Sequence, residues 1–173
     1  MEKYIWLFPI IFIFHDMEEI IGFGIWLKNN KKLLGEKYPK ILSTYKDFST
    51  EGFALAVFEE LAVCIAVSAL TLADIDFIKY MWLGAFAACT LHFVIHIGQA
   101  IVLRQYIPAT ATSIICLPIS VWILYRCFSS ISGNWLYAAA FIALGIVLVA
   151  VNLKFAQKLI GMFTRKAGIP PIV

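Results

Sequence analysis

The sequence predicts an all-α integral membrane protein, a bundle of about five transmembrane helices. Hydrophobic residues make up 62% of the 173 residues, where a soluble domain has about 45–50%. Charged residues make up only 14%, against about a quarter in a soluble domain, and the mean hydropathy is +0.87. A soluble fold of this composition would have too little polar surface, so the composition excludes an ordinary soluble domain.

Five apolar stretches have the length of a membrane-spanning helix, which is about 20 residues for about 30 Å of hydrocarbon. A helix is the form that satisfies the backbone hydrogen bonds of such a stretch within lipid. The predicted helices comprise residues 4–27, 52–73, 78–103, 108–126 and 134–154. No repeat or low-complexity segment divides the chain, so we expect a single domain, 1–173.

The connections between the predicted helices are short except for residues 28–51. Four hydrophobic residues of this loop fall on one helical face among lysines: Ile41, Leu42, Tyr45 and Phe48. This pattern predicts a short helix that lies on the membrane surface. Ser49 or Thr50 is a suitable N-cap for the helix that follows, and the fourth turn is expected at residues 129–133.

The basic residues predict the orientation of the bundle. Eleven of the 14 Lys and Arg residues lie in the loop 28–51, at Arg104 or in the C-terminal tail, and the other three are Lys3, Lys79 and Arg126. Because cytoplasmic loops carry the excess of Lys and Arg, we expect the N-terminus outside and the C-terminus in the cytoplasm. A bacterial-type inner membrane and an endomembrane both satisfy this arrangement, and we expect the bacterial-type inner membrane.

Histidines and carboxylates are concentrated inside the apolar segments. All three histidines and five of the 11 acidic residues lie there: His15, Asp16, Glu18, Glu19, Glu59, Glu60, His92 and His96. Each carboxylate near the centre of a membrane helix costs roughly 2.5–3.5 kcal/mol, and no Lys or Arg lies at that depth to compensate. Protons or bound cations must therefore neutralise these groups, and a divalent metal would take histidine as a further ligand.

Helical spacing brings these residues into one layer. His15, Glu18 and Glu19 follow the pattern i, i+3, i+4, and His92 and His96 follow i, i+4, so each set shares one helix face. Measured from the cytoplasmic helix ends, these residues and the glutamate pair lie about 10–18 Å deep. Three antiparallel helices therefore place their polar residues at one level.

Glu59, Glu60 and Asp16 are the other polar residues of this layer. Glu59 and Glu60 are 100° apart on a helix, so one faces inward and the other supports a histidine. Asp16 lies a quarter turn from His15 and is expected beside the site or at the interface. Gly22 lets another helix approach closely.

Small residues extend the histidine-bearing face of the helix at residues 78–103. Ala85, Ala88 and Cys89 precede His92 on this face. We expect them to leave room for an apolar substrate next to the polar layer.

The segment His15-Asp16-Met17-Glu18-Glu19 resembles the signature of the HXXEE family, small polytopic membrane proteins named for that motif. The likeness extends to the Glu59-Glu60 pair and to two histidines of the third helix, and so covers about the first hundred residues. The resemblance implies a shared site at His15, Glu18 and Glu19. It does not supply a reaction.

The sequence favours a membrane-embedded metal-dependent enzyme with its site in the cytoplasmic half of the bilayer. We expect one or two divalent ions, zinc, iron or manganese, because mixed imidazole and carboxylate ligands suit these metals. The expected ligands are His15, Glu19, Glu59, His92 and His96. Glu18 and Glu60 are the expected catalytic residues. Hydrolysis of a lipid-like or prenyl-type substrate is favoured over oxidation by a two-metal site.

Two other functions stay open. Intramembrane acids and histidines also build proton- or metal-linked transporters, although no inverted repeat is visible. A non-catalytic assembly protein would use the polar layer to hold helices together, but such pairs contribute less than about 1 kcal/mol each. The expected partners are the bilayer and a lipid-like substrate, with no nucleic acid; self-association into a homo-oligomer is left open.

Overall fold

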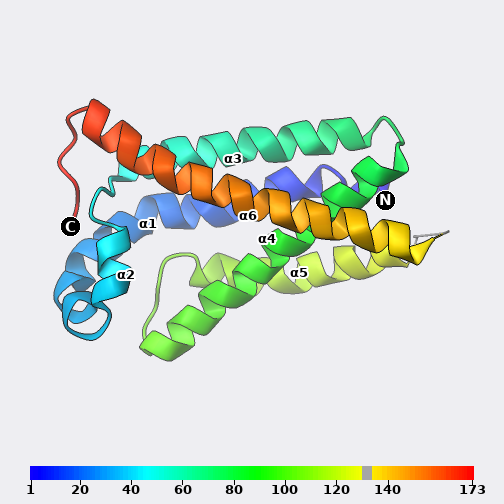
Figure 1. Cartoon of the computed structure of the whole chain (residues 1–173). Helices are drawn as coiled ribbons and strands as arrows, with labels where there is room; N and C mark the ends of the chain where they lie inside the picture. The colour runs from blue at the N-terminus through cyan, green and yellow to red at the C-terminus, as the bar shows by residue number, and fades with distance from the viewer. Residues whose placement is uncertain (130–133) are drawn as a thin grey trace.

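The computed structural model describes residues 1–129 and 134–173. In these residues the fold is all-α, as the sequence predicts (Figure 1). A short 3-10 helix, Glu2–Tyr4, precedes six α-helices in the described residues. The α-helices are α1 (Leu7–Lys37), α2 (Pro39–Thr44), α3 (Thr50–Thr71), α4 (Asp76–Leu103), α5 (Thr110–Phe128) and α6 (Trp135–Lys166). Residues 130–133, where the sequence predicts the fourth turn, lie outside the described residues.

The first and last long helices continue beyond their apolar stretches. Whereas α3, α4 and α5 begin and end within two residues of the prediction, α1 extends to Lys37 and α6 to Lys166. The predicted ends at residues 27 and 154 are therefore wrong. Lys, Leu, Gln and Arg are good helix formers outside the bilayer too, and α1 ends at the residue before Tyr38, which precedes a proline and leaves helical geometry.

The segment after α1 folds back onto that helix. Its only helix is α2, six residues long, and Leu42, Tyr45 and Phe48 pack against the end of α1 in a small hydrophobic cluster. Ile41 stays half exposed. The hydrophobic face that the sequence predicts on the membrane surface thus packs mainly against α1 and holds α2 there. Ser49 caps α3 as expected, accepting a hydrogen bond of 3.0 Å from the backbone amide of Gly52.

Four helices in the described part of the chain are long and apolar enough to cross a membrane: α3, α4, α5 and α6. Only 11–28% of the residues in the apolar window of each are buried inside the bundle, so most of these hydrophobic side chains face outward. Of the five predicted spans, α1 alone does not meet these limits of length and composition. It is 31 residues long, but Asp16, Glu18 and Glu19 interrupt its apolar part.

Two glycines set the crossing of α4 and α6, which pack closely together (Figure 1). A Cβ atom on Gly84 would collide with the carbonyl oxygen of Ile142, and one on Gly145 with that of Met81. The two backbones therefore touch directly, the close approach that glycine permits between membrane helices.

Side chains, and not closely packed backbones, fill the space between α1 and α4. In the described residues α1 packs mainly along α3, and α4 along α5 and α6, so α1 and α4 share little direct backbone contact. Along α1, Ile11 belongs to a large hydrophobic cluster that includes Phe86, and Leu27 belongs to the small cluster near α2. His15 and Glu19 lie between these two clusters, where polar side chains bridge α1 and α4.

The segment between α1 and α3, the loop between α4 and α5 and the C-terminal tail lie at the same end of the bundle. Figure 1 shows α2, the start of α3, the loop from α4 to α5 and the C-terminus together at the left, and the N-terminus at the right. We call the left end the loop end. The basic residues that the sequence assigns to one side therefore gather at one end of the structure.

Candidate metal centre

Helix α1 presents its motif to two different neighbours. His15 and Glu19 are one helical turn apart, are 1% and 9% exposed, and face α4. Glu18 is half-buried and faces the start of α5, where its hydrogen-bond partners lie. The spacing of the motif thus divides its three residues between two helices.

Helix α4 contributes two histidines separated by one turn. Nε2 of His96 lies 2.8 Å from Nε2 of His92 and 3.2 Å from Oε1 of Glu19. The ring centroid of His15 lies 5.4 Å from that of His92 and 5.2 Å from that of His96. The three imidazoles and one carboxylate therefore meet in one place.

These four side chains fit the ligand set of a single divalent ion. Each offers one ligand atom, and these atoms all lie within 4.8 Å of one another. Ligands at about 2.0–2.1 Å from a tetrahedral metal lie about 3.3 Å apart, close to the 2.8 and 3.2 Å separations observed. Nε2 of His15 is buried and has no hydrogen-bond partner among the described residues. The group of His15, Glu19, His92 and His96 is therefore able to hold a metal ion.

Glu18 is bound to the first turn of α5 and to the loop before it. Its Oε2 atom accepts hydrogen bonds from the backbone amide of Thr112 at 2.7 Å and from the Thr112 hydroxyl at 2.6 Å. Its Oε1 atom accepts from the amide of Ala111 at 3.4 Å and from the hydroxyl of Tyr106. The Thr112 hydroxyl also lies 3.1 Å from Nδ1 of His15.

The hydrogen bond to Glu18 changes the acidity of Tyr106. This residue lies in the loop between α4 and α5 and is 58% exposed. Donation to the Glu18 carboxylate favours the protonated phenol and raises the pKa of Tyr106 to about 12.

Two further carboxylates lie beside the four ligands, toward α3. Asp16 is 4% exposed; its Oδ1 atom lies 3.9 Å from Nε2 of His15, and its Oδ2 atom has no hydrogen-bond partner among the described residues. Glu60 is half-buried, and its charge acts on both Asp16 and Glu19. Asp16 lies beside the site, one of the two places expected for it.

Glu59 lies outside the group of four. Its Oε2 atom accepts a hydrogen bond of 3.2 Å from the Asn152 side chain of α6, so this carboxylate contributes to the contact between α3 and α6. Of the seven predicted site residues, the structure brings His15, Glu19, His92 and His96 together, joins Glu18 to the start of α5, and turns Glu59 toward α6.

Aromatic rings fill the layer on the N-terminal side of the site. The ring of His15 lies 4.7 Å from that of Phe93, and Phe8 contacts Phe86 with ring centroids 5.4 Å apart. Ala85 is buried in this cluster. The small residues of α4 thus accommodate aromatic side chains at this level, where the sequence predicts room for a substrate.

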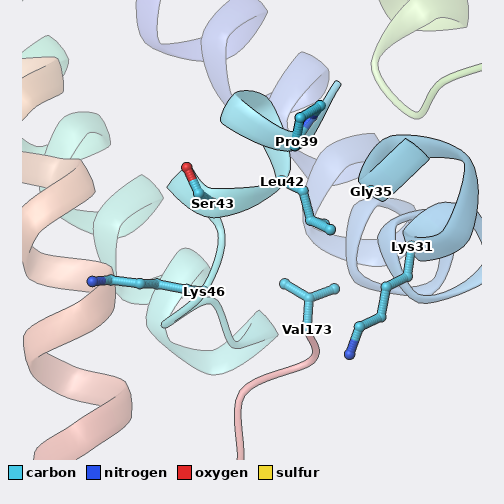
Figure 2. A pocket seen from close by; sticks show the side chains of 7 residues that line it. All are labelled: Lys31, Gly35, Pro39, Leu42, Ser43, Lys46 and Val173. Atoms are coloured by element: carbon cyan, nitrogen blue, oxygen red, sulfur yellow. The ribbon is translucent and has the colours of Figure 1, made fainter. Parts of the chain in front are cut away.

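A cavity of about 230 Å³ at the loop end lies away from this centre (Figure 2). Its lining residues are Lys31, Gly35, Pro39, Leu42, Ser43, Lys46 and Val173. None of the candidate ligands is among them. Figure 2 shows the side chains of Lys31 and Lys46 extending in different directions, so the cavity does not focus positive charge.

Sequence reasoning missed three partners of the predicted residues: Tyr106, Thr112 and Asn152. A signal existed for Thr112, because it falls in the first turn of a predicted helix, where free backbone amides attract a carboxylate. That first turn also lies at the same end of the bundle as the motif. Nothing in the pattern of the sequence points to Tyr106 or Asn152.

No curated protein and no solved structure matches the chain. A family model described as a protein of unknown function with HXXEE motif matches residues 6–123, which is more than half of the chain. The matched range contains all four ligands, Glu18 and the start of α5. The resemblance seen in the sequence is confirmed, and the chain belongs to the HXXEE family.

Proposed function

We propose that this chain is a membrane-embedded metal-dependent hydrolase that holds one divalent ion through His15, Glu19, His92 and His96. The observation that carries the proposal is the convergence of these four ligand atoms, buried between two helices. A network that only joins helices needs one or two polar pairs, and each such pair contributes little. Three histidines and a carboxylate around one point are the ligands of a metal site.

The ion would activate a water molecule for attack on a carbonyl group. Four protein ligands in a tetrahedral arrangement would leave no position for water, so catalysis would require the ion to accept a fifth ligand, as zinc can. Glu60 is the proposed general base, since it is within electrostatic range of Glu19 and outside the ligand group. Its carboxylate takes a proton from water while the water oxygen bonds to the carbonyl carbon. It then gives the proton to the leaving oxygen as the carbon–oxygen bond breaks.

The position of the site supports a lipid-like or prenyl-type substrate. We place α1 across the membrane beside α3, α4, α5 and α6, with the N-terminus outside and the loop end in the cytoplasm, as the positive-inside rule requires. Seven residues separate His96 from the end of α4 at Leu103, a depth of about 10 Å. Bonds near the polar end of a membrane lipid lie at such a depth.

The test combines metal analysis with isotope labelling. Detergent-purified protein is expected to contain one equivalent of metal, and His92→Ala/His96→Ala to contain none. Membranes containing wild type or Glu60→Gln are then incubated in oxygen-18 water, and lipid products are identified by mass spectrometry. We expect labelled acid products from wild type only, with metal retained in Glu60→Gln.

Each outcome separates the competing functions. Label that enters from molecular oxygen, and not from water, would contradict hydrolysis and favour oxidation. Protein with metal but without products in either membrane would favour transport. Protein purified without chelators that contains no metal would favour an assembly role.

A further inference from the structure

The start of α5 lacks a cap of its own. Its N-cap residue, Ala109, has no side chain that can accept a hydrogen bond, although the first amides of any helix need acceptors. The Glu18 carboxylate of α1 supplies them, because it accepts from the backbone amides of Ala111 and Thr112. The positive end of the helix dipole favours an ionised carboxylate at this position.

The Thr112 side chain connects this cap to His15. A threonine hydroxyl has a single proton, and the shortest bond of this hydroxyl, 2.6 Å, runs to the Glu18 carboxylate. The carbonyl oxygen of Ala109, at 3.3 Å, is a more distant and uncharged acceptor. The hydroxyl oxygen is therefore left to accept a hydrogen bond of 3.1 Å from the protonated Nδ1 of His15.

This arrangement decides which nitrogen of His15 is free. When Nδ1 carries the proton, Nε2 keeps its lone pair. The Nε2 atom is the one without a hydrogen-bond partner in the described residues. Polar groups that bind the far nitrogen of a ligating histidine fix its tautomer and direction in this way.

We propose that Glu18 and Thr112 are positioning residues that hold His15 in the tautomer and direction needed to bind the metal. The proposal rests on the proposed metal centre, and it separates the roles of the motif. His15 and Glu19 supply ligand atoms, whereas Glu18 acts through Thr112 of a distant segment.

Contacts on either side keep this segment in place. Gly22, one turn after Glu18, lies against Pro108, and a Cβ atom at Gly22 would come within 2.8 Å of the proline ring. Tyr106 donates its hydroxyl proton to Glu18 from the same loop. The loop before α5 is thus docked on α1 at two points, Tyr106 on Glu18 and Pro108 on Gly22.

The first test measures metal affinity. Thr112→Val keeps the shape of the side chain and removes the hydroxyl, whereas Thr112→Ser keeps the hydroxyl. We expect Thr112→Val to weaken Zn²⁺ and Co²⁺ binding about 10–100-fold in a competition titration, and Thr112→Ser to bind as wild type does. Equal affinity of Thr112→Val and wild type would overturn the proposal.

The second test reads the tautomer without metal. In His92→Ala/His96→Ala, or in the matching asparagine pair if the alanine protein does not fold, His15 is the one histidine left of three. Nitrogen-15 NMR of the imidazole should show the proton on Nδ1, a mixture after adding Thr112→Val, and the first state again with Thr112→Ser. A proton on Nε2, or no response to Thr112→Val, overturns the positioning role.

The two tests distinguish failure of the proposed metal centre from failure of the positioning role. Wild type that binds no metal would contradict the proposed metal centre, and the NMR measurement would still decide whether Thr112 orients His15. A purely structural role of Thr112 would lower the unfolding temperature and leave the tautomer of His15 as it is.

Discussion

Nε2 of His96 lies 3.2 Å from Oε1 of Glu19, and this contact joins α4 to α1 in the middle of the bundle. The two helices share little direct backbone contact in the described residues, so their connection depends on side chains at this level. An ion bound here would add a link between two helices that otherwise meet through aromatic and polar side chains. The metal centre should therefore contribute to the stability of the fold as well as to chemistry.

Chelation is expected to lower the unfolding temperature of the wild-type protein in detergent. A ligand that binds the folded state alone stabilises it by about 2.7 kcal/mol at a free concentration one hundred times its dissociation constant. Unfolding followed by circular dichroism, with zinc or with a chelator, measures the difference. The control is His96→Ala, in which both conditions should give the same unfolding temperature. An unchanged wild-type midpoint would argue against a metal that links α1 and α4.

Gly145→Ala is expected to destabilise the protein, because the new methyl group meets the carbonyl oxygen of Met81 in the backbone of α4. Forced overpacking of this kind costs about 1–3 kcal/mol. Gly98→Ala is the matched control, since no neighbouring atom lies within 4 Å of a Cβ atom at that position. It should be neutral or stabilise α4 by up to about 1 kcal/mol through helix propensity. Unfolding in mixed detergent compares the two variants, and equal effects would contradict the close crossing of α4 and α6.

Ala109→Gly is expected to stabilise the start of α5. Ala109 has a φ angle of 92°, in the left-handed region that costs a residue with a Cβ atom roughly 1–2 kcal/mol. Glycine loses more chain entropy on folding, so the net gain should be up to about 1 kcal/mol. Gly168, with a φ of 66° and open space around it, provides the reverse test. Gly168→Ala should lower the free energy of unfolding. If Ala109→Gly also lowered the free energy of unfolding, Ala109 would not hold this left-handed conformation in the protein.

Tyr106 is expected to titrate at a pH of about 12, above its ordinary value of 10.0. The bond from its phenol to Glu18 exists only in the protonated form. Its contribution to stability is therefore complete below pH 10 and is lost as the pH rises through 12. The difference in tyrosinate absorbance between wild type and Tyr106→Phe measures this pKa. In Glu18→Gln the value should fall toward 10, and a wild-type value near 10 would mean that the bond does not form.

The positions of the four candidate ligands follow from the sequence because the periodicity of a helix and its rise per residue determine them. Helical periodicity puts His92 and His96 on one face, and the rise per residue puts them at the depth of His15 and Glu19. Both arguments hold for any antiparallel helices of this length. The apolar stretches likewise mark α3, α4 and α5 to within two residues.

The sequence does not tell which neighbour each face meets. Glu18 is on the same face as Glu19 but is bound by the start of α5, and Glu59 is adjacent to Glu60 but is bound by Asn152 of α6. These partners depend on how five long helices pack, a property that periodicity within one helix cannot supply. The ends of α1 and α6 also escape prediction, since a helix does not have to end where its apolar stretch ends.

The most direct measurement is the metal content of single variants, determined by mass spectrometry on purified protein. The account predicts one equivalent in wild type and a marked loss in His15→Ala, Glu19→Gln, His92→Ala and His96→Ala. It predicts one full equivalent in Glu59→Gln, whose carboxylate faces α6. Loss of metal in Glu59→Gln, or full retention in any of the four ligand variants, would contradict the single-ion centre.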